Sequence, residues 1–210
     1  MTRIPREIVL SLYDEGVDAF AATAEGLTEA EWDGVACGEW TAVELARHVL
    51  AVAGWYHDWL DRAERGDSAP AFEAQDLALR NAEALRGLTE LDGRAAVAQF
   101  VERARAYRDR LPAAWNLPFG YPRGTVTAGL HAGMAACEWQ LHTWDLARAR
   151  GRAYGPRDPA TLYAAASACI VAAEGGMKGR VAAALAPVGA RLRPWEAILR
   201  RSGRAPGPDD

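Results

Sequence analysis

The sequence has no apolar run long enough to cross a membrane. Its longest uncharged, alanine-rich stretch, residues 163–173, falls well short of the roughly 20 residues that a spanning helix needs. The segment MTRIPREIVLSLYDEG has charges scattered among its apolar residues and lacks the continuous apolar core of a signal peptide. We therefore expect no membrane partner and a cytoplasmic location.

The sequence is also poor in cysteine and has no excess of positive charge. Three widely spaced cysteines, Cys37, Cys137 and Cys169, do not indicate a disulfide framework, and we expect them to be small buried thiols. The formal net charge of -4 and the isoelectric point near 5.6 provide no overall basic surface. Nucleic acid is therefore not an expected partner.

Strand-like alternation and internal repeats are absent, whereas helical periodicity recurs along the chain. Thr41 followed by Glu44 forms a capping box, and it predicts a helix that ends before Gly66. Asp158 before Pro159 predicts a second helix start. The segment AAWNLPFGYPRG, rich in proline and glycine, is interpreted as a loop. The predicted helices cover residues 5–25, 41–65, 71–86, 92–112, 125–150, 158–185 and 194–201.

These helices predict an all-α fold, a four-helix bundle with additional C-terminal helices. We expect the bundle to span residues 1–155 and a helical extension, residues 156–203, to pack on it. The tail, residues 204–210, is expected to be disordered. The sequence leaves a homodimer open as one arrangement of the chain.

Glu138 and His142 lie four residues apart on the predicted helix 125–150, so they share one face of it. This pair is one half of a metal site, or it is a hydrogen-bonded pair without a metal. His131 lies on the same face, but it is about 10 Å along the helix from Glu138, too far to share an ion with it. We expect His131 either at the mouth of a pocket or as a polar cap on the first turns.

A third candidate ligand, His48, lies on the predicted helix 41–65. Its imidazole is either a satisfied core group or a metal ligand. Together with Glu138 and His142 it would make a set of two histidines and one glutamate, with one position open for water or substrate. His57 lies about half a turn away from the face of His48, and we expect it at the surface.

Four segments of the sequence carry a family resemblance. They are CGEWTAVELARHVLAVAGWY, LPFGYPRG, HAGMAACEWQLHTWDLARARGR and RPWEAILRRSGRAPG. They resemble DinB-like metal-binding proteins, in the subgroup similar to the N-terminal domain of mycothiol-dependent maleylpyruvate isomerase. The resemblance covers most of the chain and implies a DinB-like bundle whose ligand positions are His48, Glu138 and His142. It implies a divalent ion, zinc in most members, with nickel as the alternative.

The resemblance also implies a function. In members of known activity, the ion activates a low-molecular-weight thiol, such as mycothiol, for attack on an electrophilic substrate. The isomerase carries a further C-terminal α/β domain, whereas about 50 residues of helical pattern follow Gly155 here. The expected reaction is therefore thiol transfer, isomerisation or detoxification, with maleylpyruvate itself not the expected substrate. Two alternatives remain: a metal-dependent hydrolase that uses the bound water, and a non-catalytic stress-response module with a structural metal.

Four residues near the expected ligands are further candidates. Asp145 either orients a ligand histidine or makes a tertiary ion pair with an arginine. Trp55 is placed to wall the pocket. Arg123, in the loop before the metal helix, either meets a carboxylate of the thiol or substrate or stays solvated. Cys37 lies in the loop before the helix of His48, and it either approaches the site or is a buried structural cysteine.

Overall fold

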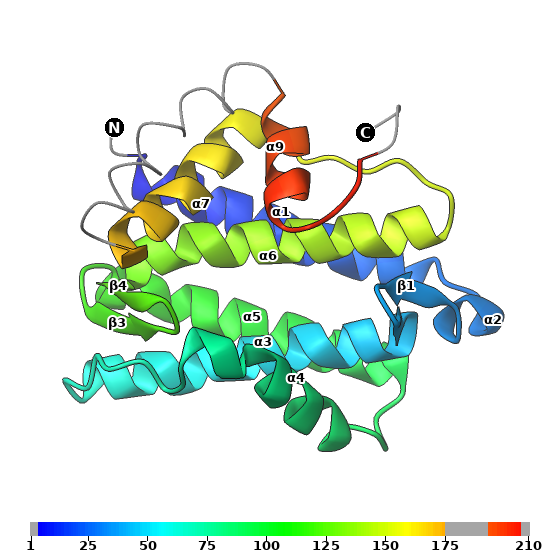
Figure 1. Cartoon of the computed structure of the whole chain (residues 1–210), viewed down its shortest axis with the longest axis horizontal. Coiled ribbons are helices and arrows are strands. Elements are labelled where there is room, and N and C mark those ends of the chain that lie inside the picture. The colour runs from blue at the N-terminus through cyan, green and yellow to red at the C-terminus, as the bar shows by residue number, and fades with distance from the viewer. Residues whose placement is uncertain (1–3, 175–192, 207–210) are drawn as a thin grey trace.

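Helix α6 lies at the centre of the structure, and the other long helices pack around it (Figure 1). The computed structural model describes residues 4–174 and 193–206. Helices α1, α3, α5 and α6 form a four-helix bundle, and α7 and α9 lie on the side of α6 away from α3 and α5. The predicted all-α class with additional C-terminal helices is confirmed. The elements are α1 (Arg6–Glu25), α2 (Glu29–Trp32), β1 (Val35–Cys37), β2 (Trp40–Thr41), α3 (Ala42–Glu64), a 3-10 turn (Ala74–Asp76), α4 (Leu77–Arg86), α5 (Gly93–Ala114), β3 (Pro118–Tyr121), β4 (Gly124–Thr127), α6 (Ala128–Ala149), α7 (Pro159–Glu174) and α9 (Pro194–Arg201).

Helix α6 is enclosed on almost every side, with 17 of its 22 residues buried. A helix in such a position is expected to be apolar all round, and most of α6 consists of alanine, glycine, leucine and tryptophan. Its exceptions include the partly buried Glu138 and the buried His142 and Asp145. The polar groups of the last two must find partners within the protein, because burial without a partner is unfavourable.

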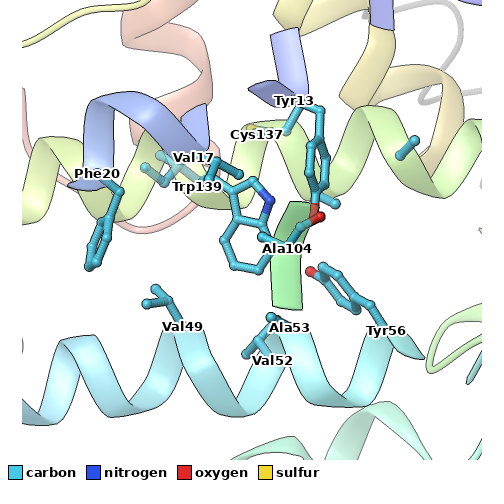
Figure 2. Close-up of a cluster of buried hydrophobic side chains, with 14 of the residues drawn as sticks. Tyr13, Val17, Phe20, Val49, Val52, Ala53, Tyr56, Ala104, Cys137 and Trp139 are labelled. Atoms are coloured by element: carbon cyan, nitrogen blue, oxygen red, sulfur yellow. The ribbon is translucent and has the colours of Figure 1, made fainter. Parts of the chain in front are cut away.

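Trp139 connects α6 to the three other helices of the bundle (Figure 2). Its fully buried ring lies edge-on to Tyr13 of α1 and to Phe100 of α5, with centroid distances of 6.1 and 4.9 Å. The ring of Tyr56 on α3 packs against it at 5.4 Å. These contacts fix the rotation of α6 about its own axis, and they thereby set which of its faces meets α3.

Helices α1 and α6 approach each other closely at Gly16. A Cβ atom at this position would lie 2.8 Å from Cβ of Trp139 and 3.3 Å from the carbonyl oxygen of Ala136. Both of these atoms belong to rigid parts of α6, so neither can move aside easily. The absence of a side chain at Gly16 therefore permits the close packing that holds the α6 segment around Glu138.

The prediction that the chain has no strands is wrong at two short antiparallel hairpins. Strands β1 and β2 pair before α3, and β3 and β4 pair in the segment that was interpreted as a loop. In the second hairpin Phe119 is opposite Val126, and both side chains are buried against the bundle. Because this strand pairing continues to Thr127, α6 begins at Ala128 rather than at Thr125.

The predicted helix boundaries hold at most other positions. The capping box at the start of α3 is present, with the backbone N–H of Thr41 donating to Glu44 at 2.8 Å and that of Glu44 to Thr41 at 3.2 Å. Helix α5, however, runs past Pro112 to Ala114. Proline removes one backbone hydrogen bond, but the burial of Leu111 and Ala114 keeps the last turn in place.

The C-terminal helices begin where the sequence predicted. Asp158 accepts a hydrogen bond from the backbone N–H of Thr161 at the start of α7, and α9 spans the predicted residues 194–201. Helix α7 is described to Glu174, so its predicted end near residue 185 lies outside the described residues. In the described part of the chain, no helix combines the length and hydropathy that a bilayer span requires.

We expect Gly16→Ala to lower the free energy of unfolding by about 1–3 kcal/mol, because the added methyl group overpacks the contact between α1 and α6. The matched control is Gly54→Ala in α3, where the new Cβ would meet only the mobile end of Arg103 at 3.1 Å. This control should raise stability by up to about 1 kcal/mol through helix propensity. Urea unfolding of both variants tests the packing argument, and equal gains in stability would contradict it.

Candidate metal centre

Three potential ligands from two helices converge at one point. His48 of α3 is buried, while Glu138 and His142 of α6 share one face of their helix. Oε1 of Glu138 lies 3.2 Å from Nε2 of His142 and 3.7 Å from Nε2 of His48. One donor atom from each residue falls within 4.8 Å of the other two. Nitrogen and oxygen atoms in this arrangement are suited to a divalent transition-metal ion such as zinc.

Local structure accounts for the position of each donor. Thr41 and Glu44 fix the start of α3, and His48 lies four residues after Glu44 with its ring 4.7 Å from that of Trp40. The spacing of four residues on α6 places Glu138 and His142 above one another. The rings of His48 and His142 lie 4.9 Å apart and nearly perpendicular, so both present Nε2 to the same carboxylate.

Asp145 determines how His142 presents its ring. Nδ1 of His142 donates to Oδ2 of Asp145 at 2.9 Å, which leaves Nε2 directed toward Glu138. Asp145 also accepts two hydrogen bonds from Arg204. Asp145 therefore contacts both His142 and an arginine, and its part in orienting a metal ligand stays a prediction.

The electrostatics of the cluster favour a cation between its donors. Burial opposes ionisation of Glu138, but its contacts with His142 and His48 hold its pKa well below the ordinary value. Burial lowers the pKa of His48, and Glu138 offsets this only in part. Burial also disfavours charge on His142, yet Asp145, Cys37 and Glu138 raise its pKa well above the ordinary value. The buried Asp145 and the partly buried Glu138 thus attract positive charge, either a proton on His142 or a metal ion.

A cavity of about 560 Å³ opens beside the three donors. Trp55 and Arg123, both expected near the site, are among its lining residues. Aromatic rings make up much of its lining, which also includes arginines from the β3–β4 hairpin and from the end of α9. The remaining lining residues include Trp40, Val52, Tyr56, Trp59, Leu77, Tyr121, Met134, Leu141, Arg201, Ser202 and Arg204.

Two other histidines lie outside this cavity. His131, expected at the pocket mouth or as a polar cap, is instead fully buried among aromatic rings, with Phe119 stacked on it at 4.4 Å. The hydroxyl of Tyr107 lies 3.2 Å from Nδ1 of His131, and burial lowers the pKa of His131 to about 3. His57 is half-buried on another face of α3, where it contacts the backbone carbonyl of Arg103 and the side chain of Arg110.

The structure also places two residues at the site that the sequence did not assign to it firmly. The half-buried Cys37 offers a sulfur within 4.8 Å of donor atoms of His142 and Asp145. Arg204 was expected in a disordered tail, and the structure corrects this by holding its guanidinium against Asp145. The rest of that tail, residues 207–210, lies outside the described residues. No sequence spacing connects Arg204 to Asp145, which is 59 residues earlier.

Comparison with known proteins adds a family match. A family model described as the mycothiol maleylpyruvate isomerase N-terminal domain matches residues 13–147, which include all three donors. The crystal structure of the mycothiol-dependent maleylpyruvate isomerase is similar, with a TM-score of 0.58 and 20% sequence identity over 80% of this chain and 68% of that one. At this identity the likeness shows the fold. No curated protein matches the sequence significantly.

We expect His131→Phe to remove part of the acid sensitivity of the fold. His131 has a pKa of about 3 in the folded chain against 6.5 in its ordinary state, so below pH 6.5 only the unfolded chain takes up this proton. Stability should therefore fall with decreasing pH by up to about 1.4 kcal/mol per unit, and the variant should lack this contribution. Urea unfolding between pH 7 and pH 4 measures it, and parallel profiles for both proteins would contradict the assignment.

Proposed function

Because this chain belongs to the mycothiol maleylpyruvate isomerase N-terminal domain family, we propose that it is an enzyme that uses a divalent metal ion to activate a low-molecular-weight thiol. The observation that carries the proposal is the convergence of His48, Glu138 and His142 beside a cavity. We propose zinc as the ion, with nickel as the alternative, and mycothiol as the thiol. The partner of the thiol is an electrophilic small molecule.

The donor set fits a catalytic ion better than a structural one. Three protein ligands leave a position for an exogenous group, whereas structural zinc sites are normally closed by four ligands. A bound divalent ion would favour the thiolate over the thiol near neutral pH, and the thiolate is the nucleophilic form. Another group of donor atoms lies nearby and consists of Cys37, His142 and Asp145. It has only His142 in common with the set of His48, Glu138 and His142.

The residues around the donors have separate tasks in this proposal. Asp145 holds the proton on Nδ1 of His142, so Nε2 is free to bind the ion. Trp40, Trp55 and Trp59 provide an apolar wall that excludes water from the reacting groups. Arg123 and Arg201 contribute positive charge to the cavity, where an anionic part of the substrate or thiol can bind.

A hydrolase that uses a bound water directly is the alternative, and it needs a general base near the ion. Among the described residues that line the cavity, the only carboxylate is Glu138, which the ion would occupy. Asp145 is held by His142 and Arg204, and their contacts keep its pKa near 2 despite burial. The residues present therefore support thiol chemistry over hydrolysis. A cytoplasmic location belongs to the same proposal, because the cosubstrate must be reduced.

Purified, chelator-free protein should contain about one zinc or nickel ion per chain. His48→Ala and Glu138→Ala should each lose it while remaining folded, because each removes a ligand. His57→Ala, a histidine on the same helix outside the cavity, is the matched control and should keep the ion. Elemental analysis with circular dichroism measures both properties. A folded wild type that takes up no added zinc would refute the metal centre.

The metal-loaded protein should consume an electrophile only when mycothiol is present. A panel of activated alkenes, epoxides and halides, assayed with and without mycothiol, tests this. Turnover should disappear in Glu138→Ala, because the thiol then has no ion to bind. Hydrolysis of an ester or amide at the same rate without thiol would favour the hydrolase, and metal binding with no turnover would favour a non-catalytic module.

A further inference from the structure

We propose that Arg204 is a positioning residue of the metal centre, which acts by fixing Asp145 and, through it, the imidazole of His142. This inference rests on the proposed function, because it concerns the affinity of the same three ligands for an ion. It adds to the centre a residue that lies 62 positions after the histidine it controls.

The contact between Arg204 and Asp145 is a two-point fork. Nε of Arg204 donates to Oδ1 of Asp145 at 2.7 Å, and Nη2 donates to Oδ2. Oδ2 also accepts the proton of Nδ1 of His142. A single donor would leave a carboxylate free to rotate, whereas a fork of two parallel hydrogen bonds defines its plane. The acceptor that His142 uses is thus held in one orientation.

Burial gives this fork its importance. The side chain of Asp145 is 5% exposed and that of Arg204 is 15% exposed, so water does not replace either partner readily. Removal of the guanidinium would leave a buried carboxylate with only the imidazole as partner. That carboxylate could then change its plane, and the imidazole of His142 would lose the fixed acceptor that sets its orientation.

The backbone places Arg204 by a defined helix end. After α9, Gly203 adopts a φ of +82°, the backbone N–H of Gly203 donates to the carbonyl of Arg200, and that of Arg204 donates to the carbonyl of Leu199. This pair of bonds is a Schellman motif. One residue later, the side chain of Arg148 donates to the carbonyl of Ala205 at 2.7 Å. The backbone is therefore fixed before Arg204 by the end of α9 and after it by a bond to α6.

A purely structural role is the competing explanation, in which the ion pair only attaches α9 to α6. The two roles differ in what they do to the ion. Loss of an ion pair with a structural role only would change the unfolding temperature but leave the ligand field of a bound ion unaltered. A positioning residue changes the affinity for the ion and the spectrum of that ion in the folded protein.

The experiment uses the full chain with zinc and cobalt as probes. Arg204→Met keeps most of the side-chain volume without the fork, and Arg204→Lys keeps the charge alone. Arg200→Met, on the exposed side of α9, is the matched control. Zinc affinity is measured by competition with a chromophoric chelator, the d–d spectrum of saturating cobalt reports the ligand field, and circular dichroism reports folding.

We expect Arg204→Met to weaken zinc binding by about 10- to 100-fold, the range found for residues that hold a metal ligand from outside. Arg204→Lys should recover only part of this loss, and its cobalt spectrum should differ from that of the wild type. Arg200→Met should match the wild type. Because Arg204 acts through Asp145, adding Arg204→Met to Asp145→Asn should weaken binding no further than Asp145→Asn alone.

Several results would overturn the inference. If the wild type binds zinc and the zinc affinities of both Arg204 variants lie within about twofold of it, Arg204 has a structural role only. In that case only this inference fails. Additive losses in the double variant would also refute it, because they would mean that Arg204 does not act through Asp145. If the wild type binds neither zinc nor cobalt, the metal centre itself fails, and the role of Arg204 fails with it.

Discussion

The burial of charged groups on helix α6 is the constraint on which the rest of the structure depends. Asp145 is a buried carboxylate and Glu138 a partly buried one, on a helix that is almost wholly enclosed, and an unpaired buried charge is strongly unfavourable. Each carboxylate has a partner from a distant part of the chain: His48 lies beside Glu138, and Arg204 pairs with Asp145. His142 lies between them and touches both. The bundle and its C-terminal helix are thus joined by one polar chain.

Much of the fold is readable from local sequence. The capping box at Thr41, the proline after Asp158 and the helical periodicity place most helices within a few residues, since these signals act over short distances. The β3–β4 hairpin is not readable in this way. Its prolines and glycines are typical of a loop, and its pairing depends on the burial of Phe119 and Val126 against residues far away in sequence.

The site shows the same division between local and distant signals. The spacing of Glu138 and His142 predicts their common face, because a helix repeats every 3.6 residues. Spacing alone does not bring His48 to them: the residues left it as either a core histidine or a third ligand, and the family resemblance favoured the ligand. The role of Arg204 depends on the path of the chain after α9, which no local pattern specifies. His131 was expected near the site because it shares a helix face with Glu138 and His142. It is instead buried in the aromatic core and does not line the cavity.

The cavity is lined by two kinds of segment: those that provide the donor atoms and those that do not. The three donors belong to α3 and α6, whose packing depends on Trp139 and Gly16. Much of the remaining lining comes from the segment at Ala74–Asn81, from the β3–β4 turn and from the end of α9. Substitutions in these outer segments can reshape the wall while the donor atoms stay in place. One scaffold can accordingly keep the arrangement of its donor atoms constant while related sequences diverge in the molecules that they accept.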